Sequence, residues 1–285
     1  MKKLVGVMLA FLFIPLNAFP TYADEELEKG DGHVGSFTVE LSPWEDVDKL
    51  IPRYSKFTVI DVDTGLRFNV QRRAGSKHAD VQPLTYEDTK IMKKIYLGKW
   101  SWKRRAILIH KDDVLIAASM HGMPHGAGAL KNGFPGHFCI HFIGSTTHRS
   151  QNVDLSHKVM IYKAAGKFDE YIHAIDPYEL IGVMMVAMNH DEKTILDTVL
   201  TEMQPKERKE LHNIVKDIDT ISISKIHTES NDVSSQAIIS VPVEVDVWNG
   251  RSRERKLLEM ILIRDGLIDQ WRIDAKVFLD EYHNK

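Results

Sequence analysis

The chain has a single cysteine, Cys139, in a segment that is dense in histidine. His137 and His141 stand two residues to either side of it, and His121 lies sixteen residues before His137. A thiol whose proton is taken by an imidazole becomes a good nucleophile. A thiolate surrounded by imidazoles is also a typical zinc ligand set. A free cysteine without either role is usually a small buried hydrophobe, but the neighbouring histidines favour a chemical role.

For a nucleophile, we expect His121 to be the general base and the pKa of Cys139 to be low. The imidazole needs a partner that fixes its tautomer, and Asp80 is the best carboxylate for that task. His137 would orient the loop or bind substrate. Backbone N–H groups near the cysteine would bind the oxyanion of a tetrahedral intermediate. The residues expected at the substrate and oxyanion positions are Gly122, Gly136, Phe138 and His141.

The alternative is a zinc site, since zinc in hydrolases keeps three protein ligands and one open position. Residues 137, 139 and 141 alternate along an expected strand and so share one face. His121 and His125 are four residues apart, but Gly122 and Pro124 between them are not helical, so they do not form a helical ligand pair. We therefore expect a cysteine enzyme that needs no cofactor. The alternative zinc ligands are His121, His137, Cys139 and His141.

The beginning of the chain has the layout of an export signal. Lys2 and Lys3 precede the apolar run 4–14, and small residues lead to Ala23. We expect a signal peptide over 1–23, a disordered leader over 24–36, and a secreted or cell-wall-associated protein; a signal kept as an anchor is the alternative. No later apolar run approaches the roughly 18 residues of a membrane span. The formal net charge of −3, with mixed signs, gives no case for nucleic-acid binding.

The first part of the chain, over 37–166, is expected to be a β-rich domain. The turn Asp63-Thr64-Gly65 joins two alternating runs and predicts a hairpin. Thr85 is the expected N-cap of a helix over 85–96. The expected strands are 37–41, 57–61, 66–70, 106–110, 114–119 and 138–143, with helices at 44–50, 153–163 and 170–175.

The second part, over 177–285, has a different order of hydrophobic patterns. Helical periodicity comes first, and alternating strands follow it, with Asn249-Gly250 and Asp265-Gly266 as turn pairs. The chain is therefore expected to be α+β. The expected helices are 178–188, 193–200 and 207–215, and the strands are 221–227, 237–247, 256–264 and 267–274.

His121-Gly122, a glycine-bearing loop and then Gly136-His137-Phe138-Cys139 resemble the catalytic signature of the L,D-transpeptidases, which are secreted, β-rich cysteine enzymes that remodel peptidoglycan. The resemblance spans about residues 57–165. It implies a cysteine acyl-transferase or hydrolase in which a peptidoglycan stem peptide passes through a Cys139 thioester. Phe138 stands where that family has glycine. The alternatives are a zinc-dependent cell-wall hydrolase and a non-enzymatic wall-binding protein.

The order of helices followed by an antiparallel meander, over about 177–283, resembles the cone-shaped fold of nuclear transport factor 2-like domains. This resemblance offers no catalytic motif. It implies a spacer, a binding module or a dimerisation element, and so a homodimer through the C-terminal domain.

Overall fold

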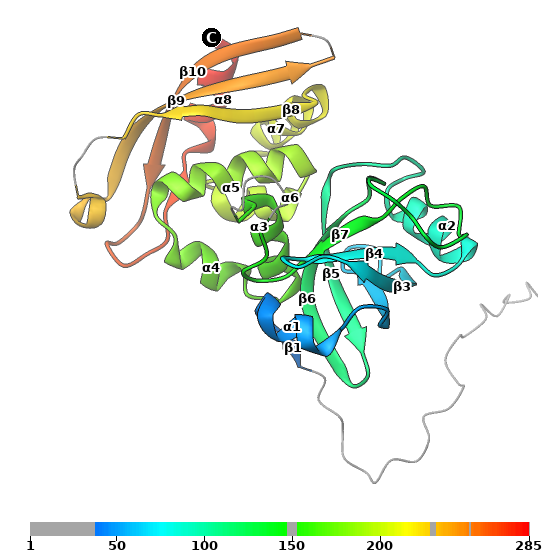
Figure 1. Ribbon diagram of the computed structural model, residues 1–285. Coiled ribbons are helices and arrows are strands. Elements are labelled where there is room, and N and C mark those ends of the chain that lie inside the picture. Colours follow the sequence, from blue (N-terminus) through cyan, green and yellow to red (C-terminus); the bar gives the residue numbers. More distant parts are fainter. Residues whose placement is uncertain (1–37, 147–152, 229–231, 251, 285) are drawn as a thin grey trace, which may run out of the picture. The chain divides into compact units, whose positions relative to one another are not determined.

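The computed structural model describes residues 38–146, 153–228, 232–250 and 252–284 (Figure 1). The predicted signal peptide (1–23) and leader (24–36) lie outside the described residues. Helices and antiparallel strands are mixed, so the α+β class is confirmed. None of the described helices is both long and apolar enough to cross a membrane. The described residues form one compact unit, and the division into 37–166 and 177–285 stays a prediction.

Six antiparallel strands close into a barrel in the spatial order β6-β5-β2-β3-β4-β7, because β7 pairs back with β6. Closure leaves these strands without a free edge on which to aggregate. β1 (Val39–Glu40) joins β6 in parallel. The predicted 63–65 hairpin is confirmed, since β2 and β3 pair across it. The barrel strands are β2 (Lys56–Asp61), β3 (Arg67–Ala74), β4 (Ala79–Pro83), β5 (Arg104–Lys111), β6 (Val114–His121) and β7 (Phe138–His141).

Two short helices accompany the barrel: α1 (Trp44–Leu50) and α2 (Tyr86–Ile95). Thr85 caps α2 as expected. Its side chain accepts from the Asp88 backbone N–H, and the Asp88 carboxylate accepts in return from the Thr85 N–H. This reciprocal capping box satisfies two N–H groups that the first turn of a helix leaves without partners.

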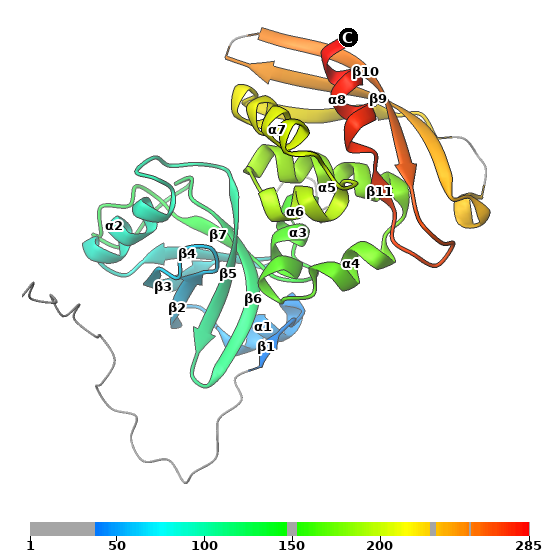
Figure 2. The same ribbon diagram turned by 180° about the vertical axis from the view of Figure 1, so that it is seen from behind.

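Helices α3 to α7 precede a four-stranded antiparallel sheet of order β11-β10-β9-β8 (Figure 2). The helices are α3 (Leu155–Ala164), α4 (Phe168–Ala174), α5 (Pro177–His190), α6 (Lys193–Val199) and α7 (Pro205–Asp217). The sheet consists of β8 (Thr220–Ile226), β9 (Ile238–Asn249), β10 (Ser252–Ile263) and β11 (Arg272–Ile273), with a 3-10 turn at Val233–Ser235.

The strand expected over 267–274 is wrong except for the two residues of β11. The chain turns at Gly266, where Asp269 N–H donates to the Gly266 carbonyl. Asp274 then caps a helix that the sequence analysis missed, α8 (Ala275–Asn284), by accepting from the Val277 N–H. An aspartate at this position favours a helix start over a continued strand.

Helix α3 packs on β5 and β6, and it belongs to the same apolar cluster as α5 to α8. Ala106 of β5 and Ala117 of β6, both fully buried, are the barrel-strand residues that are buried in that cluster. Their small side chains leave room for a helix to approach the sheet closely. The predicted domain over 37–166 includes α3, whereas the side chains of α3 help to build the core of the later helices and sheet.

Candidate functional site

The strand register places Asp80 next to the cysteine. Asp80 on β4 pairs directly with Cys139 on β7. Directly opposed residues of antiparallel strands project to the same face. The Cys139 Sγ atom consequently lies 3.4 Å from Asp80 Oδ1, and only 3% of the cysteine surface is exposed. Asp80 was expected to fix the tautomer of the His121 imidazole, whereas its carboxylate contacts the sulfur itself.

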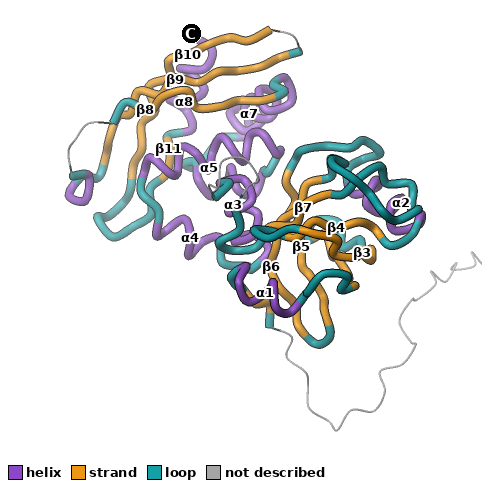
Figure 3. The backbone as a smooth tube through the Cα atoms, in the orientation of Figure 1, coloured by secondary structure: helices purple, strands orange, loops and turns teal. Residues whose placement is uncertain are grey.

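The loop between β6 and β7, drawn in teal in Figure 3, brings a further histidine to the sulfur. His125 and His137 form an isolated antiparallel bridge with N···O distances of 3.0 and 2.9 Å. This bridge places His125 Nε2 3.3 Å from Cys139 Sγ. Gly126, at φ +58°, permits the close approach, since a Cβ there would lie 2.3 Å from the His137 ring.

Backbone carbonyls fix the tautomers of the two loop histidines. His125 Nδ1 lies 3.2 Å from the Met123 carbonyl oxygen, and His137 Nδ1 lies 3.1 Å from that of Ala127. A carbonyl oxygen only accepts, so each Nδ1 carries a hydrogen. In the neutral ring the Nε2 atom then holds a lone pair. For His125, that lone pair faces the thiol.

Asp80 is held as a carboxylate by its histidine neighbours. His78 Nε2 lies 3.2 Å and His137 Nε2 3.7 Å from Asp80 Oδ1. Burial alone would raise the pKa of Asp80, but the hydrogen bond and charge of His78, with the charge of His137, outweigh it and lower the pKa to about 2. His78 Nδ1 also donates to the Thr146 carbonyl at 2.9 Å. The sulfur therefore has an anion beside it near neutral pH.

This environment contradicts the expected low pKa of Cys139. Burial raises the pKa of the thiol, and the charge of Asp80 and its hydrogen bond with the thiol raise it further. Both effects disfavour a thiolate, since one removes water from it and the other adds like charge. Cys139 is thus a protonated thiol until a base or a cation removes its hydrogen.

His121 lies in the same cluster, but its predicted partner, Asp80, makes no hydrogen bond with its Nδ1 atom. It is 4% exposed, and its Nδ1 has no hydrogen-bond partner among the described residues. Burial, followed by the positive charge of Arg104, lowers the pKa of His121 well below its ordinary value, so the ring is neutral. Its ring packs against Trp102 and His125 at centroid distances of 4.7 and 5.1 Å.

A stack of buried rings continues behind the cysteine. His141 lies between His78 and His157, at centroid distances of 4.6 and 3.8 Å. His157 comes from α3, and its Nδ1 is 2.9 Å from Ser119 Oγ. Burial, with His141 and Arg104 nearby, lowers the pKa of His157 well below its ordinary value. Sequence reasoning missed His157, because it lies on a different element with no spacing relation to the cysteine.

The expected oxyanion site is not formed as predicted. The N–H of Gly122 donates to the Ser101 carbonyl at 2.8 Å, and that of Gly136 donates to the Phe134 carbonyl at 3.0 Å. Both donors are therefore already used. Phe138 is fully buried in the barrel core, where its ring lies 5.8 Å from that of Phe134. His141 belongs to the ring stack, so neither side chain faces an incoming substrate.

Among the described residues, three groups of possible metal ligands share the cysteine, and within each group the ligand atoms lie within 4.8 Å of one another. The predicted zinc set of His121, His137, Cys139 and His141 is divided among all three. As expected, residues 121–125 are not helical. The groups are His78 with Cys139 and His141; His121 with His125 and Cys139; and Asp80 with His137 and Cys139.

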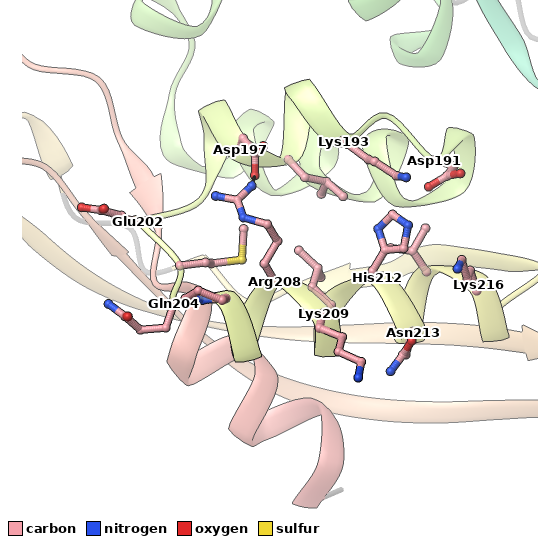
Figure 4. A pocket seen from close by; sticks show the side chains of 15 residues that line it. Asp191, Lys193, Asp197, Glu202, Gln204, Arg208, Lys209, His212, Asn213 and Lys216 are labelled. Atoms are coloured by element: carbon pink, nitrogen blue, oxygen red, sulfur yellow. Dashed lines mark hydrogen bonds and ion pairs between the residues drawn. The ribbon is translucent and has the colours of Figure 1, made fainter. Parts of the chain in front are cut away.

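A large pocket of about 940 Å³ lies at α6 and α7, and Figure 4 shows its lining. Leu196 and Leu211 contribute apolar surface, and Arg208 forms an ion pair with Asp197. Its described lining contains no residue of the cysteine cluster. The pocket is therefore a second place where the protein could bind a small molecule, unrelated to the thiol chemistry.

The comparisons with known proteins leave the function open. Neither protein-family models nor curated proteins match the chain. One matching solved structure is a variant of Rd1NTF2_05, an NTF2-like designed protein, at 19% identity over 34% of this chain and 90% of that one. Its TM-score is 0.27. A likeness at this level does not establish a shared fold, so any function has to be argued from the cysteine cluster itself.

Proposed function

We propose that the chain is an exported cysteine acyl-transferase or hydrolase that acts on peptidoglycan stem peptides through a Cys139 thioester. The observation that carries the proposal is the 3.3 Å contact between Cys139 Sγ and His125 Nε2, whose Nδ1 hydrogen is held by a carbonyl. A general base must lie within hydrogen-bond reach of the proton that it removes, and His125 meets that requirement. The L,D-transpeptidase-like spacing of His121, His137 and Cys139 supports the substrate class.

In the proposed reaction, His125 Nε2 takes the thiol proton as the sulfur attacks the carbonyl carbon of the stem peptide. The new C–S bond gives a tetrahedral intermediate. The C–N bond then breaks, and the amine leaves with the proton from His125. An acceptor amine or water next attacks the thioester, the C–S bond breaks, and the proton returns to the sulfur. Asp80 keeps the thiol protonated until substrate binds, because its charge opposes an early thiolate.

Substrate would reach the sulfur past His125 and His137. Both side chains are half-buried, and His137 is 18% exposed, whereas the cysteine behind them is 3% exposed. Trp102, at 49% exposure, lies against His121 and His125 and offers an apolar surface at the same entrance. We infer that these three side chains contact the acyl donor.

The test is the intact mass of the protein after incubation with a stem peptide or a β-lactam of the carbapenem class. We expect a mass increase equal to one acyl group for a stem peptide, or to the whole molecule for a carbapenem, whose amine stays attached after the ring opens. The added mass should map to the peptide that contains Cys139. The Cys139→Ser variant should remain unmodified, and His110→Ala, which alters an exposed histidine of β5, should react like the unchanged protein. An adduct that persists in Cys139→Ser, or no adduct with any acyl donor, would refute the proposed thioester.

We further propose that residues 177–285 form a nuclear transport factor 2-like module that dimerises or binds a ligand. Support comes from the order of its elements, in which helices precede an antiparallel sheet. The pocket at α6 and α7 would be its ligand site.

A further inference from the structure

A second chemical role follows from the atoms that converge on the cysteine, and it does not rest on the proposed acyl transfer. His125 and His137 each donate through Nδ1 to a backbone carbonyl. A histidine whose Nδ1–H is held in this way presents a fixed Nε2 lone pair, which is the outer-shell arrangement found around metal-binding imidazoles. Here both Nε2 atoms face the Asp80 and Cys139 pair.

Three of the distances between these atoms match the edges of a tetrahedron of metal ligands. Two ligands that are each about 2.0–2.3 Å from a zinc ion, in tetrahedral geometry, lie about 3.3–3.7 Å from each other. Cys139 Sγ is 3.4 Å from Asp80 Oδ1 and 3.3 Å from His125 Nε2. Asp80 Oδ1 is 3.7 Å from His137 Nε2, and the two histidine rings are 4.4 Å apart. The ligand atoms of Asp80, His137 and Cys139 all lie within 4.8 Å of one another, and His125 contacts the same sulfur, so a small ion at the sulfur would have these four residues around it.

Charge points to a divalent cation. One thiolate and one carboxylate together carry two negative charges, and two neutral imidazoles add none. A divalent ion would make the buried site neutral, which removes the cost of an uncompensated charge in a desolvated place. Thiolate and imidazole ligands are characteristic of zinc, whereas magnesium and calcium prefer oxygen ligands.

We propose that the cluster binds a divalent cation of the zinc class through Asp80 Oδ1, His125 Nε2, His137 Nε2 and Cys139 Sγ. Binding forms an S–metal bond and releases the thiol proton to solvent, so one proton leaves for each ion that is bound. His78 then orients the Asp80 carboxylate through the contact of its Nε2 atom. The buried Nδ1 atom of His121 has no hydrogen-bond partner among the described residues, so His121 could replace one of the four ligands. Coordination withdraws electron density from the sulfur and makes it a weaker nucleophile, so the bound ion should slow acylation by the acyl donor.

The test is titration of the metal-free full chain with Zn²⁺ by calorimetry, together with the absorption spectrum of the Co²⁺ form. We expect one ion per chain, release of about one proton near pH 7, and a sulfur-to-cobalt charge-transfer band. Cys139→Ser should abolish that band. His125→Gln should weaken Zn²⁺ binding by more than about 100-fold, since even outer-shell partners are worth about 10–100-fold. His110→Ala should bind as the unchanged protein does.

Circular dichroism of each metal-free variant shows whether it is folded, and His137→Gln is the second ligand variant if His125→Gln does not fold. The proposal is overturned if the number of Zn²⁺ ions bound per chain does not reach a defined value of one. It is also overturned if the Co²⁺ form lacks the charge-transfer band, or if both glutamine variants bind Zn²⁺ with unchanged affinity. Ion binding as expected, without any acyl adduct in the metal-free protein, would leave the metal site standing and refute the proposed function. An adduct without ion binding would have the opposite meaning.

Discussion

Replacement of His125 by Gln should lower the rate of acyl-adduct formation by about 10²–10⁴, the usual contribution of a positioned general base. The reason is that His125 Nε2 is the imidazole nitrogen found 3.3 Å from Cys139 Sγ. Glutamine has a similar size but cannot take the proton. The rate is measured by mass spectrometry with metal-free protein and saturating acyl donor, so that neither metal occupancy nor binding affinity enters.

His121→Gln is the matched comparison, because spacing alone favours His121 as the base. His121 is buried in the same cluster, and its ring packs on His125. We expect His121→Gln to lose stability but to retain an acylation rate within about tenfold of the unchanged protein. This loss of rate is smaller than the loss of about 10²–10⁴-fold expected when a general base is removed. A severe defect in His121→Gln together with a nearly normal His125→Gln would return the role of base to His121.

The free energy of unfolding of the metal-free protein should fall as the pH is lowered below about 6.5, the ordinary pKa of histidine. Burial, followed by the charge of Arg104 and Lys103, lowers the pKa of His190 to about 4, and burial lowers the pKa values of His121 and His157 well below the ordinary value. Below pH 6.5 the unfolded chain binds protons that the folded protein cannot bind. Each such histidine then costs about 1.4 kcal/mol per pH unit until its folded pKa is reached.

Urea unfolding at pH 7.5, 6.5, 5.5 and 5.0 measures this slope, and three histidines give up to about 4 kcal/mol per pH unit. His157→Gln removes one of them and should reduce the slope by about one proton. The groups around His157 are His141, Arg104, His121 and His190, of which Arg104 stays charged throughout. Stability that is constant from pH 7.5 to 5.0, or an unchanged slope in His157→Gln, would show that these rings are not buried in the neutral form.

Much of the local structure could be predicted because particular residues specify it. The turn at 63–65, the Thr85 cap and the Asn249-Gly250 pair each determine the backbone within a few residues. β4 was missed because its sequence, Ala-Asp-Val-Gln-Pro, is neither apolar nor alternating. Its side chains are all buried because β4 lies between two strands of a closed barrel. This position depends on the tertiary structure, so the local sequence pattern does not predict it.

The candidate site was predictable only in part for a similar reason. Cys139, His137 and Asp80 were identified from residue type, and the structure brings them together. His125 was considered only as a metal ligand, since four-residue spacing in a non-helical segment says nothing about contact. Its position depends on the bridge to His137, which closes the loop through backbone hydrogen bonds. His78, which directly precedes β4, and His157, on α3, reach the cluster through tertiary packing alone.

The pH dependence of iodoacetamide labelling of the native, metal-free protein tests most directly whether Cys139 is held as a protonated thiol beside Asp80. Labelling near pH 7 should be much slower than that of a free-thiol peptide. It should rise only at a pH above the ordinary thiol pKa of about 8.5, and it should become rapid when the protein is denatured. Fast labelling of the native protein near neutral pH, with a midpoint below about 8.5, would contradict the account.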